Sequence, residues 1–247
     1  MPAFKLLTVE RDAKTVKGSK FGVLTGILYL APHTISGYQT CPKSTTGCRE
    51  SCLFTAGYAG MYPKINQARI NKTLMFFQNR AQFFDDLVKD IEKVIKYAAL
   101  KNMIPAIRLN GTSDIAWEKF SVIRGNNIFK NIFMAFPEIN FYDYTKIFNR
   151  KAALDIKNYN LTFSLSESND KDAVKALQNG FNVSVVMNVT RSKELPKRWS
   201  GIPVIDGDVS DLRFKDKGGR IVGLRAKGKA RKDTSGFVRK VDETFRN

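Results

Sequence analysis

The chain has 247 residues, of which 43% are hydrophobic and 11% aromatic, enough to form a buried core. Lys and Arg outnumber Asp and Glu by 41 to 23, and the net charge of +18 favours a polyanionic partner such as nucleic acid. The chain has no run of eighteen apolar residues and no apolar stretch of the signal-peptide kind at its start. We therefore expect a protein of the reducing cytoplasm without a membrane segment.

The first sixty residues combine a basic start, one strand and a long irregular segment. Residues 1–20 are mixed and basic, and we expect them to form an N-terminal arm or an edge strand. Residues 22–30 are apolar and β-prone, which predicts a strand that Ala31-Pro32 ends. Residues 33–60 show no periodicity and hold several glycines. We expect a long loop there, and long loops in compact domains are usually functional.

All the cysteines of the chain, Cys41, Cys48 and Cys52, lie in that loop. Three thiols at this spacing can converge on one point, so we predict a site for zinc or an iron–sulfur cluster. His33, the only histidine, is a candidate fourth ligand, although a surface residue is the alternative. For the thiols, the alternatives are three buried apolar side chains, or one disulfide with a thiol left over.

The rest of the chain alternates between helical and β-prone segments. Apolar residues recur every three or four positions in the predicted helices, 68–78, 80–101 and 170–179, and Gly180 is expected to cap the last one. Strands are predicted over 106–110, 138–142, 160–164, 182–187, 202–205 and 221–224. Short apolar strands between helices indicate mainly parallel strands. We predict a single α/β domain over residues 1–247, as a complete or partial (β/α) barrel, with an open doubly wound sheet as the alternative.

Polar residues recur where these strands end. In parallel α/β folds the carboxyl ends of the strands build the active site, so we expect these residues to face one cavity. We predict three catalytic aspartates, with Asp143 and Asp206 as the candidate nucleophiles and Asp114 as the general acid/base or a base-recognition residue. The predicted substrate-binding residues are Arg108, Asn110, Ser113, Lys146, Glu167 and Asp208. Ordinary turn chemistry is the alternative for each residue taken singly.

The C-terminal segment 225–247 begins with a basic stretch punctuated by glycine. Arg225, Lys227, Lys229 and Arg231 are predicted to bind a phosphate backbone. A solvated basic surface, or the Lys and Asn bias of an AT-rich genome, would account for the same residues without a partner.

Several motifs resemble a bacteriophage protein family known as a numbered gene product. They include CPKSTTGCRESC at 41–52, RLNGTSDI at 108–115, FYDYTK at 141–146, VIDGD at 204–208 and GLRAKG at 223–228. The resemblance extends from about residue 24 to residue 238. It implies a phage protein that acts in the cytoplasm of an infected bacterium.

Two enzyme classes are similar in expected architecture. The guanine transglycosylases, which exchange guanine for a 7-deazaguanine in tRNA or DNA, are β/α barrels with a zinc site and catalytic aspartates at strand ends. Radical enzymes that use S-adenosylmethionine carry three cysteines after the first strand of a partial barrel, and these hold an iron–sulfur cluster.

The charge sets the order of these hypotheses, because an enzyme on duplex DNA must neutralise phosphates. We expect a phage enzyme that inserts a deazaguanine base into double-stranded DNA by base exchange. A radical iron–sulfur enzyme is the first alternative, with S-adenosylmethionine as its cofactor. A non-enzymatic DNA-binding protein with a structural metal site is the second.

Overall fold

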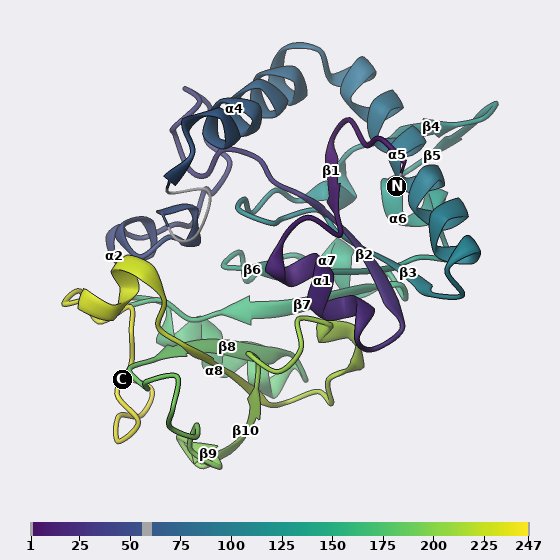
Figure 1. Cartoon of the computed structure of the whole chain (residues 1–247). Helices are drawn as coiled ribbons and strands as arrows, with labels where there is room; N and C mark the ends of the chain where they lie inside the picture. Colours follow the sequence, from purple (N-terminus) through teal and green to yellow (C-terminus); the bar gives the residue numbers. More distant parts are fainter. Residues whose placement is uncertain (1, 56–60, 247) are drawn as a thin grey trace. The chain divides into compact units, whose positions relative to one another are not determined.

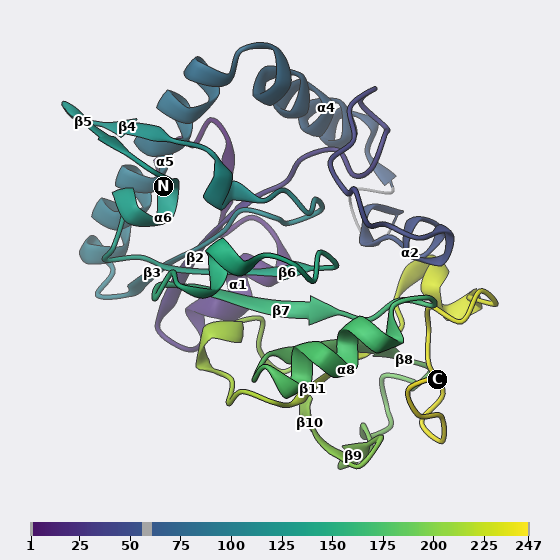
Figure 2. The same ribbon diagram turned by 180° about the vertical axis from the view of Figure 1, so that it is seen from behind.

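The computed structural model describes residues 2–55 and 61–246, and its ribbon is drawn from two sides in Figures 1 and 2. The chain forms an α/β protein that divides into two compact units. Unit 1 contains Met1–Cys41, Asn66–Asp143 and Asn149–Asn160, and unit 2 contains Pro42–Ile65, Tyr144–Phe148 and Leu161–Asn247. Each unit gathers segments that are far apart in the chain.

Parallel strands form the centre of unit 1. Strand β2 (Val23–Leu28) pairs in parallel with β3 (Ile104–Arg108), which pairs in parallel with β6 (Asn140–Thr145). Every residue of β2 is buried, as expected for a strand covered on both faces. β1 (Leu7–Val9) pairs antiparallel with β2, and the sequence 1–20 also holds the helix α1 (Ala13–Ser19).

Two long helices lie where the sequence predicted helices, α4 (Pro63–Gln78), whose residues 63–65 belong to unit 2, and α5 (Arg80–Leu100). The buried residues of α4 are Arg69, Thr73 and Phe76, two of them polar, so only α5 follows the predicted apolar periodicity. Buried residues recur along α5, including Phe84, Leu87, Ile91, Val94 and Ala98, and the helix packs on β1, β2 and β3. Its Asp90 is also buried. One oxygen of this carboxylate is satisfied by hydrogen bonds from the backbone N–H groups of residues 5, 6 and 7, at 2.7–3.1 Å. This carboxylate ties the N-terminal segment to the helix.

The remaining elements of unit 1 are short. They are the 3-10 turn η2 (Trp117–Lys119), the hairpin of β4 (Val122–Arg124) and β5 (Asn127–Phe129), and the helices α6 (Ile132–Ala135) and α7 (Lys151–Leu154). Trp117 is fully buried among Phe76, Phe83 and Phe84. Such aromatic packing fixes the chain after β3, where the candidate site lies.

Unit 2 repeats the parallel arrangement. β7 (Tyr159–Ser164), whose first two residues belong to unit 1, pairs with β8 (Asn182–Met187), and β8 pairs with β11 (Ile221–Arg225). β11 pairs in parallel with β10 (Ile202–Asp206), which pairs antiparallel with β9 (Arg198–Trp199). Helix α8 (Asp170–Gln178) packs on β8, and Gly180 adopts the left-handed conformation predicted for its cap.

Several short helices complete unit 2. They are α2 (Thr46–Glu50), the 3-10 turns η1 (Leu53–Thr55) and η3 (Arg213–Lys215), and η4 (Gly228–Lys232). The predicted cysteine loop 33–60 is therefore partly helical, and its residues 56–60 lie outside the described residues.

The prediction of an α/β protein with mainly parallel strands is confirmed. The sheet of each unit has an open edge, because β1 pairs only with β2 and β9 only with β10 among the strands that the structure describes. No closed barrel is therefore found in the described part of either unit. No helix in the described residues is long and apolar enough to cross a membrane.

Candidate functional site

The loop after β3 in unit 1 is organised by Asn110. Its side-chain oxygen accepts hydrogen bonds from the Ile115 backbone N–H, the Ser113 hydroxyl and the Trp117 indole at 2.9–3.0 Å. Gly111 is required in this loop, since a Cβ there would lie 2.7 Å from the Leu28 carbonyl oxygen. Asn110 and Ser113, predicted as substrate-binding residues, are both buried and bonded to each other.

Asp143 lies inside β6, not after the strand end as the sequence suggested, and its side chain is completely buried. One carboxylate oxygen accepts the Asn110 backbone N–H at 2.7 Å and the other accepts the Tyr159 hydroxyl at 3.1 Å. Burial raises the pKa of Asp143 to about 7, although the nearby Arg108 guanidinium and these hydrogen bonds oppose the shift. Such a carboxyl is poised to exchange a proton near neutral pH.

A buried arginine connects Asp143 to two further carboxylates. Arg150 donates from Nε to Glu118 at 3.0 Å, bonds the same carboxylate through Nη2, and also donates to the Tyr159 hydroxyl at 3.2 Å. Its Nη1 lies 3.8 Å from Asp114 Oδ1. We call these five residues, Asp114, Glu118, Asp143, Arg150 and Tyr159, the Arg150 network.

Asp114 is the member of this network with the most exposed side chain, at 12%, against 2% for Glu118 and 3% for Arg150. Its backbone N–H donates to the Thr40 carbonyl at 2.8 Å, which fixes its place beside the residue before Cys41. The Cys41 sulfur lies 3.7 Å from the Thr112 carbonyl oxygen and accepts the His33 backbone N–H at 3.4 Å. Cys41 and the loop after β3 are therefore neighbours in unit 1.

None of the three cysteines is in a disulfide, and they are divided between the units: Cys41 belongs to unit 1, whereas Cys48 and Cys52 belong to unit 2. In residues 2–55 and 61–246, no three side chains of His, Cys, Asp or Glu are gathered so that they could hold a metal ion. The His33 ring nitrogen Nδ1 lies 3.4 Å from the Thr34 hydroxyl.

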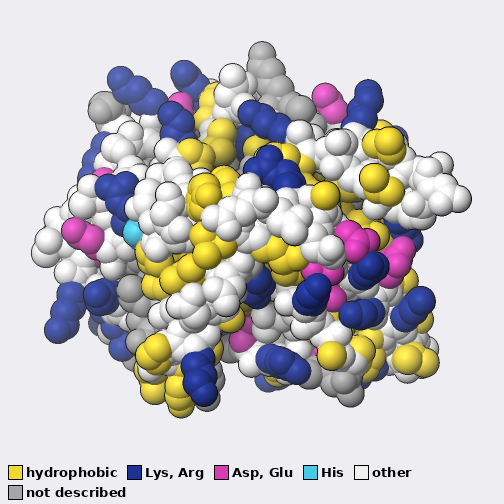
Figure 3. Space-filling view, turned by 90° about the horizontal axis from the view of Figure 1, so that it is seen from above, with side chains coloured by type: hydrophobic (Ala, Val, Ile, Leu, Met, Phe, Trp, Pro, Cys, Tyr) yellow, Lys and Arg dark blue, Asp and Glu magenta, His cyan; other side chains and the backbone are white. Residues whose placement is uncertain are grey.

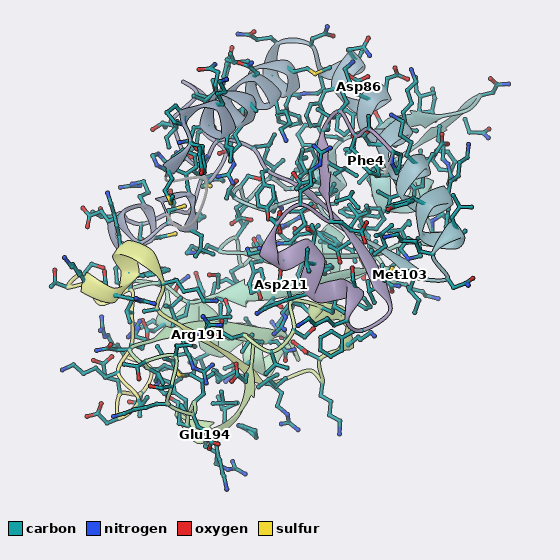
Figure 4. The ribbon with its side chains drawn as sticks, viewed as in Figure 1. Phe4, Asp86, Met103, Arg191, Glu194 and Asp211 are labelled. Carbon is teal, nitrogen blue, oxygen red and sulfur yellow. The ribbon has the colours of Figure 1, made fainter. Side chains whose placement is uncertain are left out.

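Predicted catalytic and DNA-binding residues neutralise one another at the end of β10 in unit 2. Arg225 contacts both oxygens of Asp206 at 2.9–3.0 Å and Asp208 at 3.2 Å, while Lys227 contacts Asp208 at 2.5 Å. Burial acts to raise the pKa of Asp208, but the two cations hold this pKa below its ordinary value. Arg225 also donates to the Lys193 carbonyl, in the segment where Figure 4 labels Arg191 and Glu194.

Two other predicted substrate-binding residues, Glu167 and Lys146, make contacts within unit 2. Glu167 accepts the Thr45 hydroxyl and the Gly47 backbone N–H, both at 2.7 Å, so its carboxylate holds the beginning of α2. Lys146 donates to the Ser164 hydroxyl at 3.0 Å and lies over the Phe237 ring. Glu167 thereby fixes the helix that carries Cys48.

Sequence reasoning gave no role to Glu118, Arg150 and Tyr159. Glu118 follows the RLNGTSDI motif closely, but nothing in its neighbourhood marked it as an ion-pair partner. Arg150 and Tyr159 lie far from Asp114 in the chain, and only the tertiary structure brings them together.

The comparisons with known proteins agree with the motifs. Neither the curated proteins nor the solved structures include a match to this chain. A family model described as Gene product 88, from bacteriophages, matches residues 5–241. That match covers nearly the whole chain, so the protein belongs to the Gene product 88 family.

Proposed function

We propose that this protein is a phage enzyme that modifies DNA by base exchange, inserting a 7-deazaguanine in place of guanine. The observation that carries the proposal is the carboxylate of Asp114 in the loop after β3, which is 12% exposed and lies 3.8 Å from the buried guanidinium of Arg150. The net charge of +18 supports a nucleic acid as the substrate.

In this proposal Asp114 is the reacting carboxylate. It attacks C1′ of the target nucleotide as the bond to guanine breaks, which forms a glycosyl ester on the enzyme. The incoming deazaguanine then displaces the carboxylate. The departing guanine takes up one proton and the incoming base releases one, so protons balance over the cycle.

The rest of the Arg150 network has a positioning role. The positive charge of Arg150 lies 3.8 Å from the Asp114 carboxylate, and Glu118 holds Arg150 by two hydrogen bonds. Asp143 has no exposed surface, so direct attack by it would require the loop after β3 to open. Asp206, in unit 2, is the alternative nucleophile, and its side chain is 34% exposed.

The test is incorporation of labelled guanine or 7-deazaguanine into duplex DNA. Asp114→Asn should lower exchange by about 100-fold or more, the usual scale for loss of a catalytic carboxylate, without weakening DNA binding. Asp85→Asn, on the exposed face of α5, is the matched control. Full exchange by the Asp114→Asn variant would reject Asp114, and loss confined to Asp206→Asn would transfer the role to Asp206.

A radical iron–sulfur enzyme with S-adenosylmethionine remains the second candidate. It is favoured by the order of the strands in unit 1, where Cys41 follows β2, and β3 and β6 then add in parallel in chain order. Zinc is the metal expected under the base-exchange proposal. The metal content of the purified protein separates these two candidates.

A further inference from the structure

Five exposed cations of unit 2 belong to two segments that are distant in the sequence. Lys43 lies just before α2 and Arg49 lies within it, whereas Lys229, Arg231 and Lys232 lie in η4. We call these five residues the α2–η4 surface. Of these five residues, the sequence analysis predicted only Lys229 and Arg231 to contact nucleic acid.

Packing within unit 2 brings the two segments together. A Cβ at Gly47 of α2 would overlap the Ser235 hydroxyl oxygen and lie 2.9 Å from the Phe237 Cβ, so α2 sits directly on the turn after η4. The Ser51 hydroxyl, at the end of α2, lies 3.5 Å from Asp233. Figures 1 and 2 both draw α2 beside the yellow helical turn that follows β11.

The cations of the α2–η4 surface are available to a ligand. None of the five forms an ion pair with a residue in the described part of the chain, and Arg49 bonds only the Ser44 carbonyl and the Thr46 hydroxyl. Arg225 and Lys227, in contrast, are engaged by Asp206 and Asp208. The charge that can meet phosphate therefore lies on η4 and α2, not at the start of the basic segment.

Few acids oppose this charge locally. Glu50 is exposed on α2. Asp233 follows η4, but its carboxylate accepts the Ser235 hydroxyl at 2.6 Å and the Val238 backbone N–H at 2.9 Å. Lys and Arg are scattered over the face drawn in Figure 3, so total charge alone does not select a binding surface. Cations that are close together, and that form no ion pair in the described residues, do select one.

We propose that the α2–η4 surface binds the phosphate backbone of a nucleic acid. This rests on the proposed function only in taking DNA as the partner. Each Lys or Arg that replaces a counterion at a phosphate adds to the affinity and to its dependence on salt. Glu167 and Gly47 hold α2 in place, and α2 also carries Cys48. A nucleic acid bound to the α2–η4 surface would therefore pass close to this cysteine.

The experiment measures binding of labelled duplex DNA by fluorescence anisotropy at several salt concentrations, with the full chain. One variant removes the η4 cations (Lys229→Ala, Arg231→Ala, Lys232→Ala), and another removes those near α2 (Lys43→Ala, Arg49→Ala). A control variant removes three exposed lysines of unit 1 and the same charge as the η4 variant (Lys96→Ala, Lys119→Ala, Lys130→Ala).

Both surface variants should bind more weakly, by roughly tenfold at about 0.1 M salt for each phosphate that is no longer neutralised. The salt slope should fall by about 0.9 for each such phosphate. Arg225→Ala and the control should change both quantities far less. Equal losses of affinity in the control would mean diffuse attraction and would overturn the proposal, as would wild-type binding by both surface variants.

Binding and exchange fail separately. A normal slope in the surface variants with loss of exchange in Asp114→Asn would reject the surface and leave the proposed function standing. Tight DNA binding by the wild type that the surface variants weaken, without any base exchange, would support the surface and reject the proposed function. Binding of the α2–η4 cations to vesicles of anionic lipid, without binding to DNA, would assign the surface to a membrane and also reject the proposal.

Discussion

Asp143 makes the stability of this protein depend on pH. The carboxyl is completely buried, and burial raises its pKa to about 7 against an ordinary value of 3.8 in the unfolded chain. Below pH 3.8 both states hold the proton and its stabilising contribution is fully present. As the pH rises towards 7 the unfolded chain releases the proton first, so this contribution is progressively lost.

We therefore predict that the free energy of unfolding falls by about 3 kcal/mol between pH 5 and pH 8 through this group. Asp143→Asn should abolish most of that fall, because an amide can still accept the Asn110 N–H and meet the Tyr159 hydroxyl without titrating. Urea unfolding at several pH values measures the effect, and exposed Asp85→Asn serves as the control. The same pH dependence in Asp143→Asn and the wild type would contradict this account.

At the scale of elements, the position of α2 depends on a residue without a side chain. Gly47 is buried against Ser235 and Phe237, and Glu167 accepts its backbone N–H. The sequence showed a glycine in a loop, with no sign that another segment packs against it.

Gly47→Ala should destabilise the protein by about 1–3 kcal/mol, because its methyl group collides with the turn at Ser235. The displaced helix should also make Cys48 react faster with a thiol reagent. The exposed neighbouring substitution Thr46→Ala tests whether any change in α2 has the same effect. Wild-type stability and thiol reactivity in Gly47→Ala would show that α2 is not held at this point.

At the scale of the whole molecule, the cysteines that are adjacent in sequence belong to different compact units. The close spacing of the cysteines in the sequence therefore did not establish a metal site. Among the described residues, no three side chains of His, Cys, Asp or Glu are grouped so that they could hold a metal ion. Chemical analysis of the purified protein is the direct route to the answer.

The cysteine-site prediction is tested on protein purified without oxygen: a metal held by the cysteines should be stoichiometric, lost in Cys48→Ala and retained in Ser51→Ala. One zinc in colourless protein would accompany base exchange by an aspartate. Iron and sulfide with visible absorption would support the radical enzyme in its place. Protein free of both metals would contradict the cysteine-site prediction and would favour the alternative that the thiols only pack against other side chains.

The sequence by itself determined the class of the fold, the long helices and the central strands, since helical and strand periodicities are local properties of the chain. It did not predict β4, β5, β9, α1, α2, α6 or α7, which are short and depend on tertiary contacts, whereas β1 is an edge strand of the kind expected within residues 1–20. It also placed acids and cations near strand ends correctly in several places, among them Asp114 and Asp206.

Only the tertiary structure decided which of these residues meet. It joined Asp114 to Arg150, placed Tyr159 between Arg150 and Asp143, and paired Arg225 and Lys227 with acids. These contacts link residues that are distant in the chain, and no local pattern encodes them. The ion pairs of Arg225 and Lys227 are also the reason why we propose a phosphate-binding surface on η4 and α2 and not at residue 225, because a cation whose charge is compensated by neighbouring acids attracts phosphate less.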